Sequence, residues 1–245
     1  MIERRTTQTI AHGSRLAVLR SGTIALVAML AVSCARLPQL TIADVSVGQG
    51  RQADCSAFFP LDRWRMVHSI ETVVAGRSAG VVVGITLVSP AEREVEAVIM
   101  TLEGLVLFHA RHSNHTTDIL RAIAPFDSPH FAKGLIEDVR LLFLPPVAVK
   151  TLLGFTPNGN FTCRYIRSDG SAVDIVPGSE DGWVLRQYDR RADLLREVTA
   201  RSQRNCSAAT GVHLPCHIDL EAYQQPAYTL RMSLIEAERM TKDNQ

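Results

Sequence analysis

The sequence has little net charge and no strongly basic domain. Its formal net charge is +1 at pH 7, of which residues 1–33 carry +3 and the remainder −2. Nucleic-acid binding depends on clustered lysine and arginine, so the folded part gives no electrostatic reason to expect a nucleic-acid partner. A hydrophobic content of 46% with 21% charged residues is typical of an ordinary folded protein.

Long apolar runs, paired cysteine motifs and phosphate-cradling glycine loops are also absent from the sequence. The N-terminal apolar run, Thr23–Val32, is too short to span a bilayer stably. There is no CxxC pair and no glycine-rich phosphate loop, so we predict no metal and no cofactor. Repeats and low-complexity tracts are missing as well, and 245 residues fit one domain plus a targeting segment.

Residues 1–33 have the pattern of a signal peptide, with basic residues, a short apolar run and then small residues. Cys34 follows Leu30-Ala31-Val32-Ser33, which resembles a bacterial lipoprotein cleavage box, although leucine stands four residues before the cysteine instead of three. If this sequence is a lipoprotein cleavage box, Cys34 becomes the acylated first residue of the mature protein. Its several acyl chains then make a lasting membrane anchor. By resemblance to bacterial lipoproteins, alanine instead of aspartate directly after the cysteine, here Ala35, favours the outer membrane. The protein would then face the periplasm. The alternative is an ordinary secretory signal with an incidental cysteine.

An apolar hairpin is the central feature of the remaining sequence. Val95–Leu102 and Leu105–His112 are two β-rich runs joined by Glu103-Gly104, which predicts a tight turn. Both faces of Ala97–Phe108 are apolar, so neither face should meet bulk water. One face can pack into a core, and the other must be shielded from water by a second element of the chain.

An amphipathic helix is predicted directly after this hairpin, over residues 128–144. Ser128-Pro129 provides a capping residue and a first-turn proline, and Pro145-Pro146 ends the helix. Its apolar residues recur at helical spacing, which predicts a stripe laid over the hairpin and a groove for an apolar ligand between them. The alternative is that the stripe is ordinary core. The candidate groove residues are Val98, Met100, Leu102, Leu105, Leu107, Phe131, Leu135, Val139, Leu142 and Phe143.

The rest of the chain divides into a tether and a succession of short strands. Residues 34–54 contain Pro38 and Gly48-Gln49-Gly50 and are predicted to be a lipidated tether, and residues 55–245 are the folded domain. Asn158-Gly159 and Asp169-Gly170 are hairpin turn signals, and Val147–Leu153 is a candidate second short helix. About ten strands with one helical interruption predict a mainly β (α+β) antiparallel barrel or half-barrel. The further strand-like runs are Arg65–Ala75, Gly80–Val88, Phe161–Arg167, Ala172–Val176, Trp183–Tyr188, Leu194–Arg201 and Tyr228–Ile235.

This order of elements resembles a known family. The Glu-Gly turn between two apolar strands, the helix start at Pro125–Pro129 and the leucine- and phenylalanine-rich helix are similar to outer-membrane lipoproteins related to the LolA/LolB lipoprotein-localisation carriers. The resemblance covers roughly Val67 to Pro146. It implies an open antiparallel β half-barrel with short helices as a lid, and a hollow that takes acyl chains without covalent bonds.

The resemblance also implies partners and a type of function. The partners would be the membrane through the lipid anchor, a lipid or acyl-chain ligand, and other lipoproteins. The protein would be a carrier or acceptor of lipid or lipoprotein, not an enzyme. Members that insert lipoproteins depend on an exposed apolar loop tip, whereas the Gly76–Gly80 turn offers only Arg77, Ser78 and Ala79, which favours holding or accepting. The main alternative is a structural or assembly lipoprotein with no ligand.

Four cysteines follow Cys34, an even number that suits an exported protein with disulfides. Cys206 and Cys216 flank a short loop and are the first expected pair, which leaves Cys55 with Cys163. All three connectivities remain open. The other possibility is a metal site, since His213 and His217 lie beside Cys216.

A literal G-x-S-x-G motif raises the further alternative of a serine hydrolase that uses Ser78. Gly76-Arg77-Ser78-Ala79-Gly80 fits the motif, but that mechanism needs a serine on a strand-to-helix turn. The residues that follow are rich in valine and predict a strand, so we interpret the motif as a hairpin turn. His109, His112 and His115 have no acidic residue adjacent in the sequence and are interpreted as a solvated strand end.

Overall fold

The computed structural model describes residues 37–43, 55–178, 182–202 and 214–240. All of these belong to one compact unit, Arg36–Gln245. The predicted signal peptide, Cys34 and Cys206 lie outside the described residues, as does His213, and the side chain of Cys55 is not described. Within the described residues, no helix is both long enough and apolar enough to cross a membrane.

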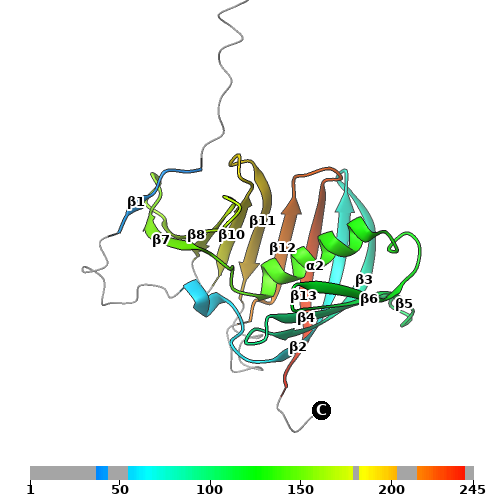
Figure 1. Ribbon diagram of the computed structural model, residues 1–245. Coiled ribbons are helices and arrows are strands. Elements are labelled where there is room, and N and C mark those ends of the chain that lie inside the picture. The colour runs from blue at the N-terminus through cyan, green and yellow to red at the C-terminus, as the bar shows by residue number, and fades with distance from the viewer. Residues whose placement is uncertain (1–36, 44–54, 179–181, 203–213, 241–245) are drawn as a thin grey trace, which may run out of the picture. The chain divides into compact units, whose positions relative to one another are not determined.

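The described residues form a single antiparallel sheet of 13 strands and one α-helix, α2 (Pro129–Phe143). The strand order is β1-β7-β8-β9-β10-β11-β12-β13-β2-β3-β4-β5-β6, so the last strand pairs with the second and the sheet is open at β1 and β6 (Figure 1). This mainly β, open arrangement is consistent with the predicted half-barrel. The strands are β1 (Thr41–Ile42), β2 (Trp64–Val74), β3 (Arg77–Ser89), β4 (Glu94–Met100), β5 (Val106–Ser113), β6 (Thr116–Ala122), β7 (Lys150–Phe155), β8 (Phe161–Ile166), β9 (Ala172–Pro177), β10 (Trp183–Tyr188), β11 (Leu194–Arg201), β12 (His217–Ala222) and β13 (Tyr228–Arg239).

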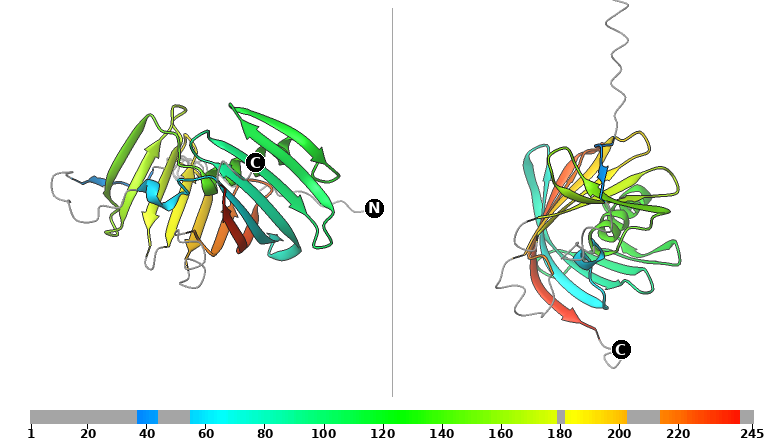
Figure 2. Two further views of the ribbon diagram at one scale, coloured as in Figure 1. Left: turned by 90° about the horizontal axis from the view of Figure 1, so that it is seen from below. Right: turned by 90° about the vertical axis from the view of Figure 1, so that its left-hand side faces the viewer.

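The sheet curves around α2, with the helix inside the curve (Figure 2, right). Apolar side chains at successive register positions form its inner surface. One such row crosses five strands from β8 to β12, and each member is at most 1% exposed. Because strand side chains alternate between faces, these residues share the face that lines the inside of the curve. The row is Cys163, Ile175, Leu185, Val198 and Leu220.

Helix α2 begins and ends as its sequence predicts. The Ser128 side chain accepts a hydrogen bond from the Phe131 backbone N–H, and Pro129 occupies the first turn. Leu144 adopts an extended conformation after the last turn, as expected for a residue that precedes a proline. The central hairpin is also confirmed, with β4 and β5 joined at a turn in which Gly104 has a positive φ of 90°.

Three predictions about the elements need correction. Val147–Leu153 was expected to be a short helix, but most of it belongs to strand β7, because its backbone pairs with β8. Part of the expected tether is docked, since β1 pairs with β7 and the Pro38 carbonyl accepts a hydrogen bond from Arg164. Besides α2, the described part of the chain has only a short 3₁₀ turn, η2 (Cys55–Phe58), instead of several lid helices.

Candidate ligand site beneath helix α2

The apolar side of α2 packs against the inner face of β4 and β5. Ala97 and Ile99 on β4, and Phe108 and Ala110 on β5, form one core cluster with the buried side chains of the helix. These four strand residues are 0–8% exposed. The Phe108 and Phe131 rings meet edge to face with centroids 5.5 Å apart, which extends the contact to the first turn of the helix.

The ten predicted groove residues divide into two groups. Those on the helix are close together against the core: Val139, Leu142 and Phe143 are 2–7% exposed, and Phe131 and Leu135 are partly buried against the same cluster. On the hairpin, Leu107 is partly buried and packs against this cluster. This group is the part of the predicted groove that the structure brings together.

The other predicted hairpin residues do not lie under the helix. Val98 and Met100 alternate with the buried residues Val95, Ala97 and Ile99, so their side chains are on the opposite face of β4. Leu102 and Leu105 lie in the β4–β5 turn, 68% and 51% exposed. The prediction for these four residues is corrected, because strand alternation assigns only one face of the hairpin to α2.

One residue on the buried face of α2, Asp138, is charged and contacts distant strands. The Asp138 carboxylate accepts a 2.5 Å hydrogen bond from Arg196 Nε on β11, and its second oxygen accepts one from the Tyr228 hydroxyl on β13. Arg196 also donates to Gln187 on β10, at 3.3 Å. Burial raises the pKa of Asp138 above its usual value, and Arg196 and Tyr228 partly oppose that shift. Asp138 therefore connects α2 to the half of the sheet that the hairpin does not reach.

A buried histidine lies beneath the last turn of the helix. His68, on β2, is 1% exposed, and its ring centroid is 5.8 Å from that of Phe143. Its Nδ1 has no hydrogen-bond partner among the described residues. Burial lowers the pKa of His68 to about 4. The contact between α2 and β2 thus depends on a neutral imidazole.

No backbone hydrogen bond joins α2 to a strand within the described residues. The helix is attached through side chains and through its two flanking segments. Before it, the Ile123 N–H donates to the Leu107 carbonyl at 3.0 Å, and after it, the Val149 N–H donates to the Ile166 carbonyl at 2.8 Å. The sheet ladders would therefore stay intact if the helix moved.

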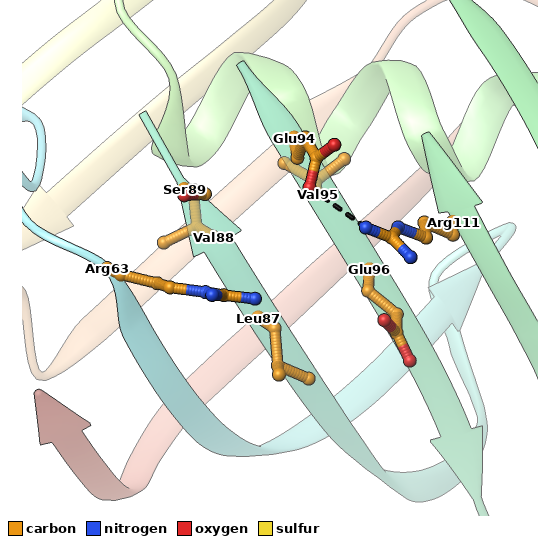
Figure 3. Close-up of a pocket in the computed structure, with 8 residues that line it drawn as sticks. All are labelled: Arg63, Leu87, Val88, Ser89, Glu94, Val95, Glu96 and Arg111. Atoms are coloured by element: carbon orange, nitrogen blue, oxygen red, sulfur yellow. Dashed lines mark hydrogen bonds and ion pairs between the residues drawn. The ribbon is translucent and has the colours of Figure 1, made fainter. Parts of the chain in front are cut away.

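Figure 3 shows a pocket of about 80 Å³ at one end of β3 and β4, outside the predicted groove. Its lining is mixed, with the polar residues Arg63, Ser89 and Glu94 beside apolar ones such as Val88. Glu94 forms a 3.1 Å ion pair with Arg111. A pocket this small, with charged residues in its lining, suits water molecules better than an acyl chain.

The remaining candidate residues do not form a catalytic or metal site in the described part of the chain. Ser78 lies within β3, paired with Val73, and the strand continues to Ser89, so no strand-to-helix turn presents it. His109 has a partner that sequence reasoning missed, since its Nε2 lies 2.7 Å from Glu96 Oε1 across the β4–β5 pair. No group of three possible metal ligands occurs among the described residues.

Two of the four predicted disulfide cysteines can be placed. Cys163 on β8 and Cys216 just before β12 are both disulfide-bonded and 1–2% exposed. Their predicted partners, Cys55 and Cys206, have no described side chains. The expected pairings therefore stay predictions.

Comparison with known proteins identifies no family. No family model matches the chain, and no curated relative matches it. Among solved structures it is similar to the crystal structure of the LolA superfamily protein NE2245 from Nitrosomonas europaea, at 11% identity and a TM-score of 0.45, over 78% of this chain and 92% of that one. A likeness this weak adds nothing to the strand order and contacts described above.

Proposed function

We propose that this protein is an outer-membrane lipoprotein of the LolA/LolB type, anchored through Cys34 and facing the periplasm. Its half-barrel would bind an acyl chain non-covalently in the space that α2 covers. In this account the protein is a carrier or acceptor of lipid or lipoprotein and not an enzyme. The same oxidising location suits its disulfide-bonded cysteines.

The observation that carries the proposal is the way α2 covers the inner sheet. Its contacts with Ala97, Ile99, Phe108 and Ala110 come from side chains, without backbone bonds to a strand in the described residues. An outward movement would leave this apolar surface open while the sheet stays paired. An acyl chain could then replace the helix contacts. Each methylene that it buries would contribute about 0.8 kcal/mol of favourable binding free energy.

A second candidate is a structural or assembly lipoprotein that binds no ligand. The close packing of α2 favours it, because Val139, Leu142 and Phe143 are 2–7% exposed and already fill the space over β4 and β5. A carrier must exchange this packing for the packing of a lipid. The two candidates therefore differ in whether α2 can move away from β4 and β5 to admit a lipid.

Lipid analysis of the purified protein tests the proposal. The full chain with Cys34→Ala, which lacks the anchoring cysteine, is purified without detergent, extracted with organic solvent and analysed by mass spectrometry. About one acyl lipid per protein is expected, and a size-matched periplasmic protein serves as the control. A chain that carries no lipid after expression and after incubation with membrane lipids would support the structural candidate.

We further propose that the protein holds or accepts its cargo and does not insert it. The residues after the β2–β3 turn, Arg77, Ser78 and Ala79, are exposed and not apolar enough to enter a bilayer. The β4–β5 turn does expose Leu102 and Leu105, so a genetic test is needed. Rescue of a strain that lacks its lipoprotein-inserting factor would overturn this part of the proposal.

A further inference from the structure

Three arginines meet at the C-terminal end of α2. Arg140 is in the last turn of the helix. Arg93, in the β3–β4 turn, donates from Nη1 and Nη2 to the Pro145 carbonyl, both at 3.2 Å. Arg167 directly follows Ile166, whose carbonyl accepts from the Val149 N–H. All three arginines are half-buried. They are near enough for the charges of Arg140 and Arg167 to act on Arg93.

No carboxylate forms an ion pair with this cluster in the part of the chain that the structure describes. Other inner arginines do have such partners, as in the Arg196–Asp138 pair at 2.5 Å. Arg93, Arg140 and Arg167 have no Asp or Glu oxygen within 4 Å among the described residues. The Nε of Arg140 is buried and makes no hydrogen bond there.

Two acidic groups whose charges act on Arg167, Asp169 and Glu137, are engaged elsewhere. The Asp169 carboxylate accepts hydrogen bonds from the Ser171 N–H at 2.9 Å and from the Ser171 hydroxyl at 2.6 Å. Glu137 is half exposed and points toward Arg196, with 3.9 Å between the charged atoms. Neither of them forms an ion pair with the three arginines.

The cluster is unfavourable as it stands. Burial lowers the pKa of Arg93, and the charges of Arg140 and Arg167 lower it further. Burial lowers the pKa of Arg167 as well, with Asp169 and Glu137 opposing the shift and Arg140 and Arg196 adding to it. Like charges held together in this way attract an anion, and guanidinium groups match the geometry of phosphate oxygens.

We infer that Arg93, Arg140 and Arg167 form a binding site for a phosphate group at the C-terminal end of α2. The phosphate can belong to a phospholipid headgroup, in which case the inference rests on the proposed acyl-chain function, or it can be free phosphate. Val147 and Val149 beside the site are 58% and 71% exposed, so an apolar surface adjoins the charged one. The negative end of the helix dipole, about half a charge, opposes an anion but is smaller than three arginine charges.

The test compares two ligands that share one acyl chain, lysophosphatidylglycerol and the corresponding monoacylglycerol, with inorganic phosphate as a third probe. Binding is measured by titration calorimetry on the full-length protein and on an Arg140→Gln/Arg167→Gln variant. Arg121→Gln, a change at an exposed arginine on the edge strand β6, is the matched control. Arg93 is left in place because it bonds to Pro145.

A preference of tenfold or more for the phosphate-bearing ligand, lost in the double variant and kept in the control, supports a headgroup site. Binding of inorganic phosphate alone, lost in the same variant, supports a free-phosphate site. Equal binding of both acyl ligands with no phosphate binding overturns the site and leaves the acyl-chain function standing. If none of the three ligands binds, both the phosphate site and the acyl-chain function are overturned. If the double variant keeps the preference for the phosphate-bearing ligand, the phosphate site is overturned.

Thermal unfolding without ligand is the second readout. Relief of the repulsion predicts a melting temperature in the double variant at or above that of the parent protein. A lower melting temperature together with unchanged ligand preference would mean that the arginines are structural, which overturns the inference.

Discussion

Asp138 on α2 and Arg196 on β11 form a buried ion pair across the inside of the sheet, with Arg196 Nε 2.5 Å from Asp138 Oδ1. The two side chains are 4% and 11% exposed, and 58 residues separate them in the sequence. A buried pair of this kind contributes little net stability, because desolvation offsets the attraction. Loss of one partner, however, strongly destabilises the fold, because the other charge stays buried without a partner. The pair therefore defines where the helix rests on the sheet.

Removal of Asp138 should destabilise the protein strongly. Asp138→Ala leaves Arg196 buried without its carboxylate, so we expect the free energy of unfolding to fall by about 3–5 kcal/mol in urea denaturation. A second change, Arg196→Met, should restore much of the loss. The control is Arg186→Ala, which breaks the more exposed Arg186–Glu197 pair and should cost less than about 1 kcal/mol. Equal effects of Asp138→Ala and Arg186→Ala would contradict the account.

The contact between α2 and β2 should depend on pH through His68. The folded-state pKa is about 4 against an ordinary value of 6.5, so between these values the unfolded chain binds a proton that the folded one does not. Stability from the neutral ring is complete above pH 6.5 and is lost as the pH falls toward 4, by about 2–3 kcal/mol between pH 7.5 and 4.5.

His68→Phe keeps a ring against Phe143 and should remove this component. Urea denaturation at the two pH values measures it as the difference between parent and variant. The lowered pKa of His112 also reduces stability as the pH falls, whereas the raised pKa of Asp138 increases it. Both contributions are present in the parent and in the variant, so they cancel in the difference. An identical pH dependence in the variant and the parent would exclude His68 as the source.

Acylation should depend on Cys34. Because this cysteine follows the apolar part of the predicted signal, Cys34→Ala is expected to abolish incorporation of radiolabelled palmitate and to release the protein from membranes. The parent chain expressed in parallel is the reference. Equal labelling of parent and variant would rule out the lipid anchor and leave an ordinary secretory signal.

The docked strand β1 can be tested at Gly154. A Cβ on this glycine would lie 2.5 Å from the Thr41 carbonyl oxygen, so Gly154→Ala should displace residues 41–43 and cost about 1–2 kcal/mol. Hydrogen exchange in that segment should increase. Gly134→Ala in α2 is the control, because its Cβ would meet no atom within 4 Å and alanine favours helix. Unchanged exchange in the Gly154 variant would contradict the β1–β7 pairing.

The elements best predicted from sequence are those with strong local signals. Ser128, Pro129 and Pro145 mark both ends of α2, and the apolar spacing between them is helical. Strand β6 (Thr116–Ala122) was missed because it is an exposed edge strand, almost all of whose side chains face solvent, so it has no apolar periodicity. Strand β12 (His217–Ala222) was missed because it is short and carries Asp219 and Glu221 between its buried residues.

The site was harder to predict than the fold. Both faces of the hairpin are apolar, so the sequence could not show whether Val98 or Ile99 would meet the helix. That choice depends on the strand register and on the side of the sheet to which α2 returns. The Asp138–Arg196 pair and the cluster of Arg93, Arg140 and Arg167 join segments far apart in the chain, for which local spacing has no signal.

Fluorescence quenching by a brominated acyl chain tests the central claim most directly. The chain has two tryptophans, Trp64 and Trp183, 2% and 3% exposed in the core cluster that includes α2. A chain that enters beneath the helix should bring bromine close to this core, so a dibrominated fatty acid should quench the emission saturably at about one chain per protein. The same fatty acid without bromine should not quench. Unchanged emission with the brominated chain, in a protein that remains folded, would mean that α2 is only part of an ordinary core.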